Sequence, residues 1–182
     1  MFELPLFRYH PDPISTGSIQ QSGEPCICCA ERRGYIYVGP VYAEDELEDQ
    51  ICPWCLADGT AHGRFDAEFT DAAAIGGFGW DEVPQEVVEA IAFRTPGFSG
   101  WQQERWFTHC ADGAAFLGRA DSRQLRGEFA AAISSVRESA PVSDDVWDTI
   151  LGSFATGPTG SPTAYVFRCL HCDTLGGYWD AD

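Results

Sequence analysis

Apolar residues recur at helical spacing in three segments of the chain. The clearest is Ser122–Ser139, where one face carries the apolar side chains Leu125, Phe129, Ala132, Ile133 and Val136. A stripe of this kind predicts an amphipathic helix with its apolar face on the core. A second helix is predicted from Pro84, whose fixed backbone angle suits a first helical position, to about Phe93. It should end before the breakers in "TPGFSGW".

The third helix should begin after Ser143. Serine is a preferred N-cap residue, and Asp144 and Asp145 supply the acidic side chains that stabilise a first turn. The apolar positions of this helix are Val146, Trp147, Ile150 and Leu151. A shorter helix is expected after Cys55, in "LADGTAHGRF".

Runs of β-branched and aromatic residues predict the strands. Tyr35–Tyr42 is predicted as a strand that breaks near Gly39 and Pro40. Arg105–Ala120 is predicted as two strands around a turn at Asp112 and Gly113, and Ala164–Asp180 as a strand, a knuckle and a strand. Residues 1–25, 75–84 and 157–162 are rich in glycine or proline and should be irregular, and residues 43–50 should form a solvated loop or a short helical turn.

Together these elements indicate an α+β fold with a mainly antiparallel sheet and two or three helices. The N-terminal part should form a module like a zinc ribbon or zinc knuckle. We expect residues 1–65 to comprise an arm and this module, and residues 66–182 to form an α+β portion, both packed as one compact unit. A chain of 182 residues is long enough to bury one sizeable core.

Charge narrows the range of partners. The chain has 11 Lys and Arg residues against 28 Asp and Glu residues, which gives a formal net charge of −17. Nucleic-acid affinity depends on basic contacts to phosphate, so we expect no nucleic-acid binding. No stretch approaches the ~20 apolar residues that a membrane span needs, and the N-terminus does not resemble a secretory signal. We therefore expect a cytoplasmic protein whose thiols stay reduced.

Two Cys-x-x-Cys pairs, Cys26 with Cys29 and Cys52 with Cys55, lie 22 residues apart. Two residues between thiolates allow both sulfurs of a tight turn to face one ion, and two such turns complete a tetrahedron. The pattern predicts a structural zinc site. Cys28 could replace a member of the first pair. The sequence "CPWC" also resembles thiol oxidoreductase sites, but those follow a strand in a βαβ unit.

A second group of possible ligands lies further along, in "WFTHC" and "FRCLHC". Cys169 and Cys172 form half of a zinc ribbon, and Cys110 would come from another strand. The fourth ligand could be His109, His171 or a water molecule. In a regular strand His109 and Cys110 point to opposite faces, so both could bind one ion only if the backbone bends. Alternatively, Cys110 is a small buried side chain, His109 is a hydrogen-bonded surface residue, and the chain holds only one zinc ion.

Six motifs in order, "FRYHPDP", "CICC", "CPWCLADG", "TPGFSGWQQERW", "HCADGAAFLG" and "FRCLHC", resemble the CbrC-like family of uncharacterised bacterial proteins. The resemblance covers Phe7 to Trp179 and implies a bacterial, cytoplasmic protein, with a family name tied to colicin tolerance. It implies no reaction. The family's fifth motif has a further cysteine where this chain has Ala114. The resemblance therefore implies that His109 or His171 replaces a lost ligand, or that the second site holds no metal.

Two other features bear on function. The segment "GFSGWQQERW", together with Trp80 and "HPDP", could line a pocket. The favoured interpretation is that Trp101 and Trp106 belong to the core and that the polar residues of the segment form a solvated edge. No serine triad motif, phosphate loop or HExxH motif is present in the sequence. The leading hypothesis is a zinc protein that binds a partner protein or a small molecule. The alternative is a hydrolase or transferase centred on Cys110, Cys169 and Cys172, with water activated at an open metal position or Cys110 as nucleophile.

Overall fold

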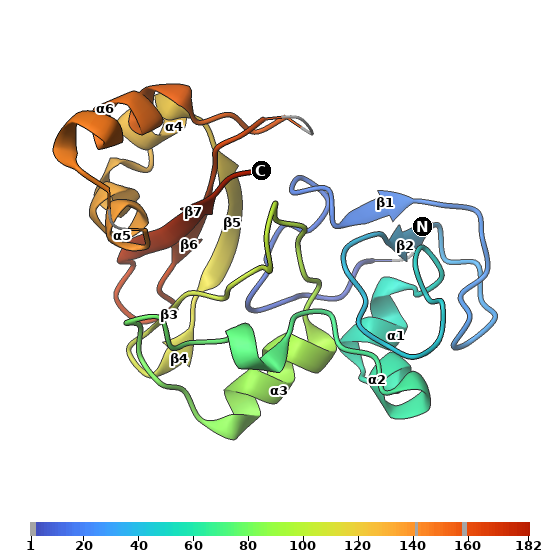
Figure 1. Ribbon diagram of the computed structural model, residues 1–182. Helices are drawn as coiled ribbons and strands as arrows, with labels where there is room; N and C mark the ends of the chain where they lie inside the picture. Colours follow the sequence, from blue (N-terminus) through green and yellow to red (C-terminus); the bar gives the residue numbers. More distant parts are fainter. Residues whose placement is uncertain (1–2, 141, 158–159) are drawn as a thin grey trace.

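The computed structural model describes residues 3–140, 142–157 and 160–182. Its strands form three antiparallel sheets (Figure 1), of which two are two-stranded and one is three-stranded in the order β5-β6-β7. The strands are β1 (Ile19–Gln21), β2 (Tyr35–Tyr37), β3 (Thr108–His109), β4 (Asp112–Gly113), β5 (Ala115–Ala120), β6 (Thr163–Arg168) and β7 (Leu175–Asp180). The predicted α+β class with antiparallel sheets is confirmed.

Six α-helices occur among the described residues. They are α1 (Pro53–Ala57), α2 (Thr60–Phe65), α3 (Gln85–Arg94), α4 (Ser122–Arg126), α5 (Ile133–Glu138) and α6 (Asp144–Ser153). Short 3₁₀ helices cover Ala72–Ala74 and Ala130–Ala132. There are more helices than the two or three expected, because α1 and α2 are short and one long predicted helix is divided.

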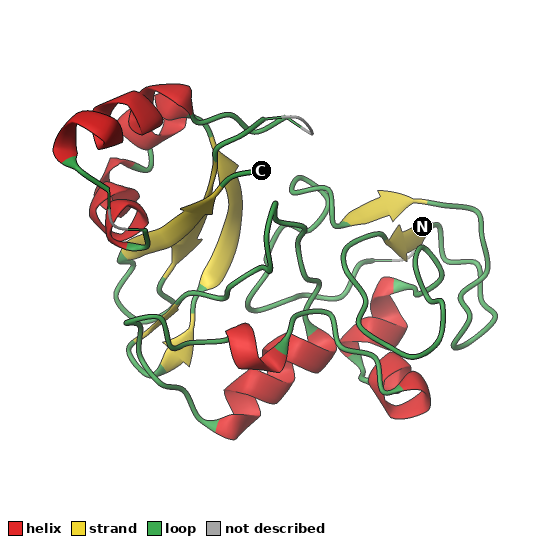
Figure 2. Cartoon of the chain, in the orientation of Figure 1, coloured by secondary structure: helices red, strands yellow, loops and turns green. Residues whose placement is uncertain are grey.

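The three-stranded sheet separates two apolar clusters. Along β6, Ala164 and Val166 face helices α4, α5 and α6, whereas Tyr165 and Phe167 face an aromatic cluster that includes Phe98. This alternation follows from the two-residue period of a strand. Figure 2 shows the C-terminal helices on one side of the sheet and the loop-rich remainder of the chain on the other. The sheet is therefore buried on both faces.

The predicted helix over Ser122–Ser139 is wrong as a continuous element. α4 ends at Arg126, and Gly127 follows with φ −116° and ψ −106°, which are not helical angles. The apolar spacing was nevertheless informative, since Leu125, Ala132 and Val136 are all buried in one cluster. A capping box between Asp121 and Gln124 fixes the start of α4. Glycine weakens a helix interior, so the chain turns there and keeps the same face inward.

Smaller differences concern the ends of elements. Pro84 is the N-cap of α3 and not its first residue, and the strand predicted to reach Tyr42 ends at Tyr37. Ser143 caps α6 as predicted, but its side chain makes no capping hydrogen bond to the backbone. Residues 43–50 contain no helix or strand, and in the loop predicted for 157–162 two residues lie outside the described part. The division into 1–65 and 66–182 stays a prediction.

The N-terminal arm is anchored by a buried histidine. His10 is fully buried, and its Nδ1 lies 2.6 Å from the carbonyl oxygen of Pro96. Because a carbonyl can only accept, Nδ1 carries the proton and donates it, and Nε2 accepts from the Thr16 hydroxyl at 2.6 Å. The arm is therefore fixed against the segment after α3. His10 is therefore part of the core.

Candidate metal centres

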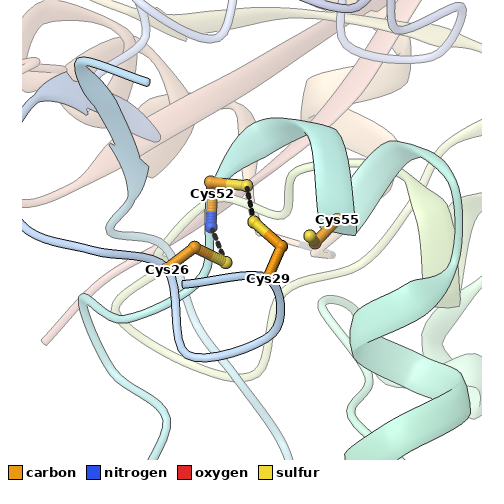
Figure 3. Close-up of side chains that lie close together, drawn as sticks. All are labelled: Cys26, Cys29, Cys52 and Cys55. Atoms are coloured by element: carbon orange, nitrogen blue, oxygen red, sulfur yellow. Dashed lines mark hydrogen bonds between the residues drawn. The ribbon is translucent and has the colours of Figure 1, made fainter. Parts of the chain in front are cut away.

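The first group consists of the four cysteines of the two Cys-x-x-Cys pairs. Cys26 and Cys29 lie in the loop after β1, Cys52 is the N-cap of α1, and Cys55 lies within α1. Figure 3 shows their side chains converging. All four sulfurs lie within 4.8 Å of one another, with 4.0 Å between those of Cys29 and Cys52. Zn–S bonds of about 2.3 Å in a tetrahedron place sulfurs about 3.8 Å apart, so the group could hold a metal ion.

Backbone N–H groups point at the sulfur of Cys26. The amides of Cys28 and Cys52 donate to it at 3.4 and 3.2 Å. Hydrogen bonds with the Cys28 and Cys52 thiols, together with the backbone amides of Cys52 and Cys29, lower the pKa of Cys26. The loop turns back through Ala30, which has a positive φ of 60°. This local geometry favours a thiolate, which is the form that binds metal.

The fifth cysteine of this region is not in the group. Cys28 is buried, but the cluster of four comprises only the two predicted pairs. A hydrogen bond to Cys26 and burial raise the pKa of Cys28, which keeps it a neutral thiol. The sequence "CPWC" also lacks the βαβ context of a redox motif, because α1 is followed by α2. The structure therefore gives no support to the two alternatives for this region.

The second group joins two hairpins. His109 and Cys110 come from the β3–β4 hairpin, and Cys169 and Cys172 from the connection between β6 and β7. One Nδ1 or Nε2 atom and the three sulfurs lie within 4.8 Å of one another. The Cys110 and Cys172 sulfurs are 3.8 Å apart, and the Cys172 sulfur is 3.5 Å from His109 Nδ1. These spacings also match one tetrahedral ion.

A tight turn brings His109 and Cys110 to the same point. The turn lies at Cys110 and Ala111, whose φ angles are 56° and 54°, and not at Asp112 and Gly113 as predicted. Asp112 and Gly113 instead form β4, which pairs with β3. Two successive residues in the left-handed region are typical of a two-residue hairpin. The bend required for both side chains to face one ion is therefore present.

The opposite side of the second group repeats the geometry of the first. The amide of His171 donates to the Cys169 sulfur at 3.4 Å, as the amide of Cys28 does to Cys26. The chain turns through Asp173, with φ 59°, and Cys169 N–H donates to the Thr174 carbonyl at 2.8 Å. Side-chain and backbone hydrogen bonds from Thr174 lower the pKa of Cys172 to about 6.

His171, the other histidine considered as a ligand, is engaged elsewhere. Its Nε2 lies 2.8 Å from Asp112 Oδ2, which also pairs with Arg8, while Asp112 Oδ1 accepts from Tyr9 at 2.9 Å. Burial opposes ionisation of Asp112, but the hydrogen bonds from His171 and Tyr9 and the charge of Arg8 lower its pKa. Sequence reasoning missed Asp112 because its partners lie 59 to 104 residues away.

The two groups differ in exposure. In the first group Cys26, Cys52 and Cys55 are buried, whereas in the second only Cys169 is buried and Cys110 and Cys172 are exposed. The predicted alternative of a buried apolar Cys110 is therefore wrong. Ala114 is 1% exposed and belongs to the aromatic core, where its carbonyl accepts the indole N–H of Trp106. The four donors of the second group do not include residue 114, so the group is complete although this position is an alanine.

The segment "GFSGWQQERW" is divided between core and surface. Trp106 is fully buried, and Trp101 is half-buried with its indole N–H donating to the Gly160 carbonyl at 2.8 Å. Gln102 and Gln103 are exposed, and with Arg105 they line a hollow in the surface. These polar residues of the segment line the hollow, but Trp101 and Trp106 do not, and neither does Trp80.

Comparison with known proteins identifies relatives over nearly the whole chain. The family model described as Uncharacterised protein family (UPF0167) matches residues 4–181. A UPF0167 protein of Mycobacterium bovis is 47% identical over 182 residues, which cover 98% of this chain and 94% of the relative. A UPF0167 protein of Pseudomonas aeruginosa is 38% identical over 170 residues, covering 93% and 92%. No solved structure matches.

Proposed function

We propose that this chain, which belongs to the uncharacterised protein family UPF0167, is a zinc protein with two metal centres that acts by binding. The observation that carries the proposal is the convergence of two sets of four donors at tetrahedral spacing. Cys26, Cys29, Cys52 and Cys55 hold the first ion, and His109, Cys110, Cys169 and Cys172 hold the second. The donors of both sets are soft thiolates, with one imidazole, which suit zinc.

The number of donors supports structural roles for both ions. Four protein ligands fill a tetrahedral zinc site, whereas a catalytic zinc keeps one position for water or substrate. The first ion staples the loop after β1 to α1. The second staples the β3–β4 hairpin to the β6–β7 connection. The two ions thus fix the positions of these segments relative to one another, and the surface that the segments form binds a partner protein or a small molecule.

The exposure of Cys110 and Cys172 favours one second candidate, a hydrolase or transferase centred on Cys110, Cys169 and Cys172. Such an enzyme would need a ligand to leave the second ion, or a metal-free Cys110 to act as nucleophile. His109 fills the position that water would take, so binding is the function that the geometry supports better.

The net charge and the lengths of the helices bear on which partners the protein binds and where in the cell it acts. The formal charge of −17 opposes nucleic-acid binding, and an anisotropy assay with labelled DNA and RNA at physiological salt should detect none. In the described part of the chain, no helix is both long and apolar enough to cross a membrane.

Reduced thiolate sites fit the cytoplasm, which is our proposed location. The tie to colicin tolerance, implied by the CbrC-like resemblance, stays a prediction.

Elemental analysis tests the metal proposal. Protein purified without added metal should contain two zinc ions per chain and no iron. Cys52→Ser should lose the first ion and Cys110→Ser only the second. Cys28→Ser is the matched control, because Cys28 lies beside the first group without belonging to it, and it should keep both. A folded protein with no metal, or with iron in place of zinc, would overturn the proposal.

A further inference from the structure

A hollow of about 630 Å³ lies at the end of β7, and no residue of either metal group lines it. Its walls come from the loop before α3, the segment after Phe98, the residues after α5, and β7 with the residues that follow. Phe78, Gln102, Gln103, Arg105, Trp179 and Asp180 are among the residues that line it. The volume suits a small organic molecule, and the mixture of aromatic and polar walls is typical of a ligand site.

Arg105 is the cation of this hollow. Its guanidinium carbon lies 4.5 Å from the ring centre of Tyr178, 5.1 Å from that of Phe78 and 5.9 Å from that of Trp80. Aromatic faces attract a cation but accept no strong hydrogen bonds, so they orient the guanidinium and leave its N–H groups free to donate. Within the described ranges, Arg105 has no carboxylate partner within 4 Å.

Among the described residues only Arg8 and Arg137 pair with a carboxylate side chain, so what distinguishes Arg105 from the other arginines is its contact with three aromatic rings. Acidic residues also lie on the same wall, but they are turned to other partners or to solvent. Asp180 is 5% exposed, and its Oδ2 accepts the backbone N–H groups of Trp101 and Gln102, each at 3.1 Å. Arg105 is thus fixed by aromatic rings and not by charge, which suits a group that must meet an incoming anion.

The wall of the hollow also carries unsatisfied polar atoms. Asp180 Oδ1 and Trp179 Nε1 are buried and have no hydrogen-bond partner among the residues that the structure describes. A buried polar atom left unpaired costs about 1–3 kcal/mol, so native structures usually satisfy such atoms with protein, water or ligand. Both residues line the hollow, so the protein leaves part of its polar wall unsatisfied.

We infer that this hollow binds a small organic carboxylate with an apolar body. The carboxylate meets the fork of Arg105, which matches two parallel N–H···O bonds, and the apolar body packs on Phe78 and Trp179. A monoanion suits the site better than a phosphate, because Asp180 and Asp182 on the same wall repel a second negative charge. The inference names a ligand class for the binding role proposed above and does not depend on the metals.

A matched pair of probes tests the charge requirement in the native protein. 3-Phenylpropionate and its neutral amide differ only in the carboxylate. Saturation-transfer NMR and tryptophan fluorescence should detect the acid below about 10 mM and show at least about tenfold weaker binding of the amide. Equal affinity of acid and amide would overturn the inference, as would no binding of either. Tighter binding of phenyl phosphate would overturn the choice of a carboxylate.

Substitution of the arginine tests the site. Arg105→Gln should weaken 3-phenylpropionate binding at least about tenfold, and Arg105→Lys, which keeps the charge but not the fork, should weaken it less. Arg123→Gln removes an exposed arginine of α4 outside the hollow and should change nothing. Circular dichroism of each sample confirms that it is folded, and binding is compared whatever the zinc content, so a failure here is separate from a failure of the metal proposal. Unchanged binding by folded Arg105→Gln would refute the site.

Discussion

Nδ1 of His109 lies 3.2 Å from the sulfur of Cys110, although the two residues are neighbours in sequence. A regular strand would place them on opposite faces. The φ of 56° at Cys110 ends β3 and turns the cysteine back toward the histidine. The hairpin thereby contributes two donors from adjacent positions. The opposite hairpin contributes Cys169 and Cys172 through a knuckle, and both sets meet at one point.

Thiol reactivity in the native protein should follow metal binding and not exposure. Cys110 and Cys172 are exposed, yet as zinc ligands they should resist iodoacetamide at neutral pH until a chelator is added. After chelation they should label before Cys169, which is buried. Peptide mapping by mass spectrometry gives the order.

Cys28 is the internal control for this labelling experiment. It is buried and belongs to neither group, so it should label only on unfolding. Rapid labelling of native Cys110 before any chelator is added would contradict the zinc assignment at the second group. It would support the alternative of a cysteine nucleophile.

Asp112 should support the second site without binding the ion. Its Oδ2 accepts from His171, in the loop between Cys169 and Cys172, and from Arg8. Its Oδ1 accepts from Tyr9 and from the amide of Gly113. In Asp112→Asn one of these oxygens becomes an NH₂ group that cannot accept. Loss of such a supporting contact typically weakens metal binding by about 10–100-fold.

Competition with a chromophoric chelator measures this loss. Asp112→Asn should release its second zinc ion to a weaker competitor than the wild type requires, while the first ion is retained. Asp66→Asn is the matched control, because Asp66 is exposed in a left-handed conformation that asparagine also adopts. If both variants released zinc like the wild type, Asp112 would have no role in holding the site.

The features that sequence predicted best are those set by local spacing. Cys26 and Cys29, and Cys52 and Cys55, each lie on one turn, so the short spacing alone brings each pair together. The sequence also predicts that the two distant turns meet at one point, because a tetrahedral zinc site takes four thiolates.

Features that depend on unusual backbone angles or distant partners were not predictable. Cysteine and alanine are both uncommon at positive φ, so the sequence favours a turn at the more typical Asp112 and Gly113 and gives no sign of the one at Cys110 and Ala111. Gly127 divides the helix predicted for Ser122–Ser139, but a single glycine is often tolerated in a helix. The hollow beside Arg105 required β7 and the loop before α3 to be placed in space.

The two N-caps of the C-terminal helices should differ in their contribution to stability. Asp121 accepts the amide of Gln124 at 2.8 Å, and the Gln124 side chain accepts the amide of Asp121 at 3.1 Å. Asp121→Ala should therefore lower the free energy of unfolding by about 1 kcal/mol. Ser143 makes no such bond to the backbone, so Ser143→Ala should cost less than about 0.5 kcal/mol. Equal losses in urea denaturation would contradict the assigned capping box.

The buried His10 should make the protein sensitive to acid. Burial lowers the pKa of His10 to about 4 from its ordinary 6.5, although the Pro96 carbonyl and the charge of Asp12 favour its protonated form. The unfolded chain then binds more protons than the folded chain between these two values. Stability is complete above pH 6.5 and falls as the pH drops toward 4, where the loss levels off. Each pKa unit is worth about 1.4 kcal/mol, so the loss reaches about 3 kcal/mol.

Comparison of two variants separates this loss from zinc release, which acid also promotes. In His10→Asn the amide nitrogen can still donate to the Pro96 carbonyl, but the side chain no longer titrates. This variant should be less stable than the wild type at pH 7, because it loses the ring contact with Phe116, but its stability should fall less between pH 6.5 and 4. His62→Asn, at a half-buried histidine stacked on Phe93, should keep the full acid dependence. Urea denaturation over this pH range measures all three proteins, and parallel curves for wild type and His10→Asn would show that His10 does not govern the acid response.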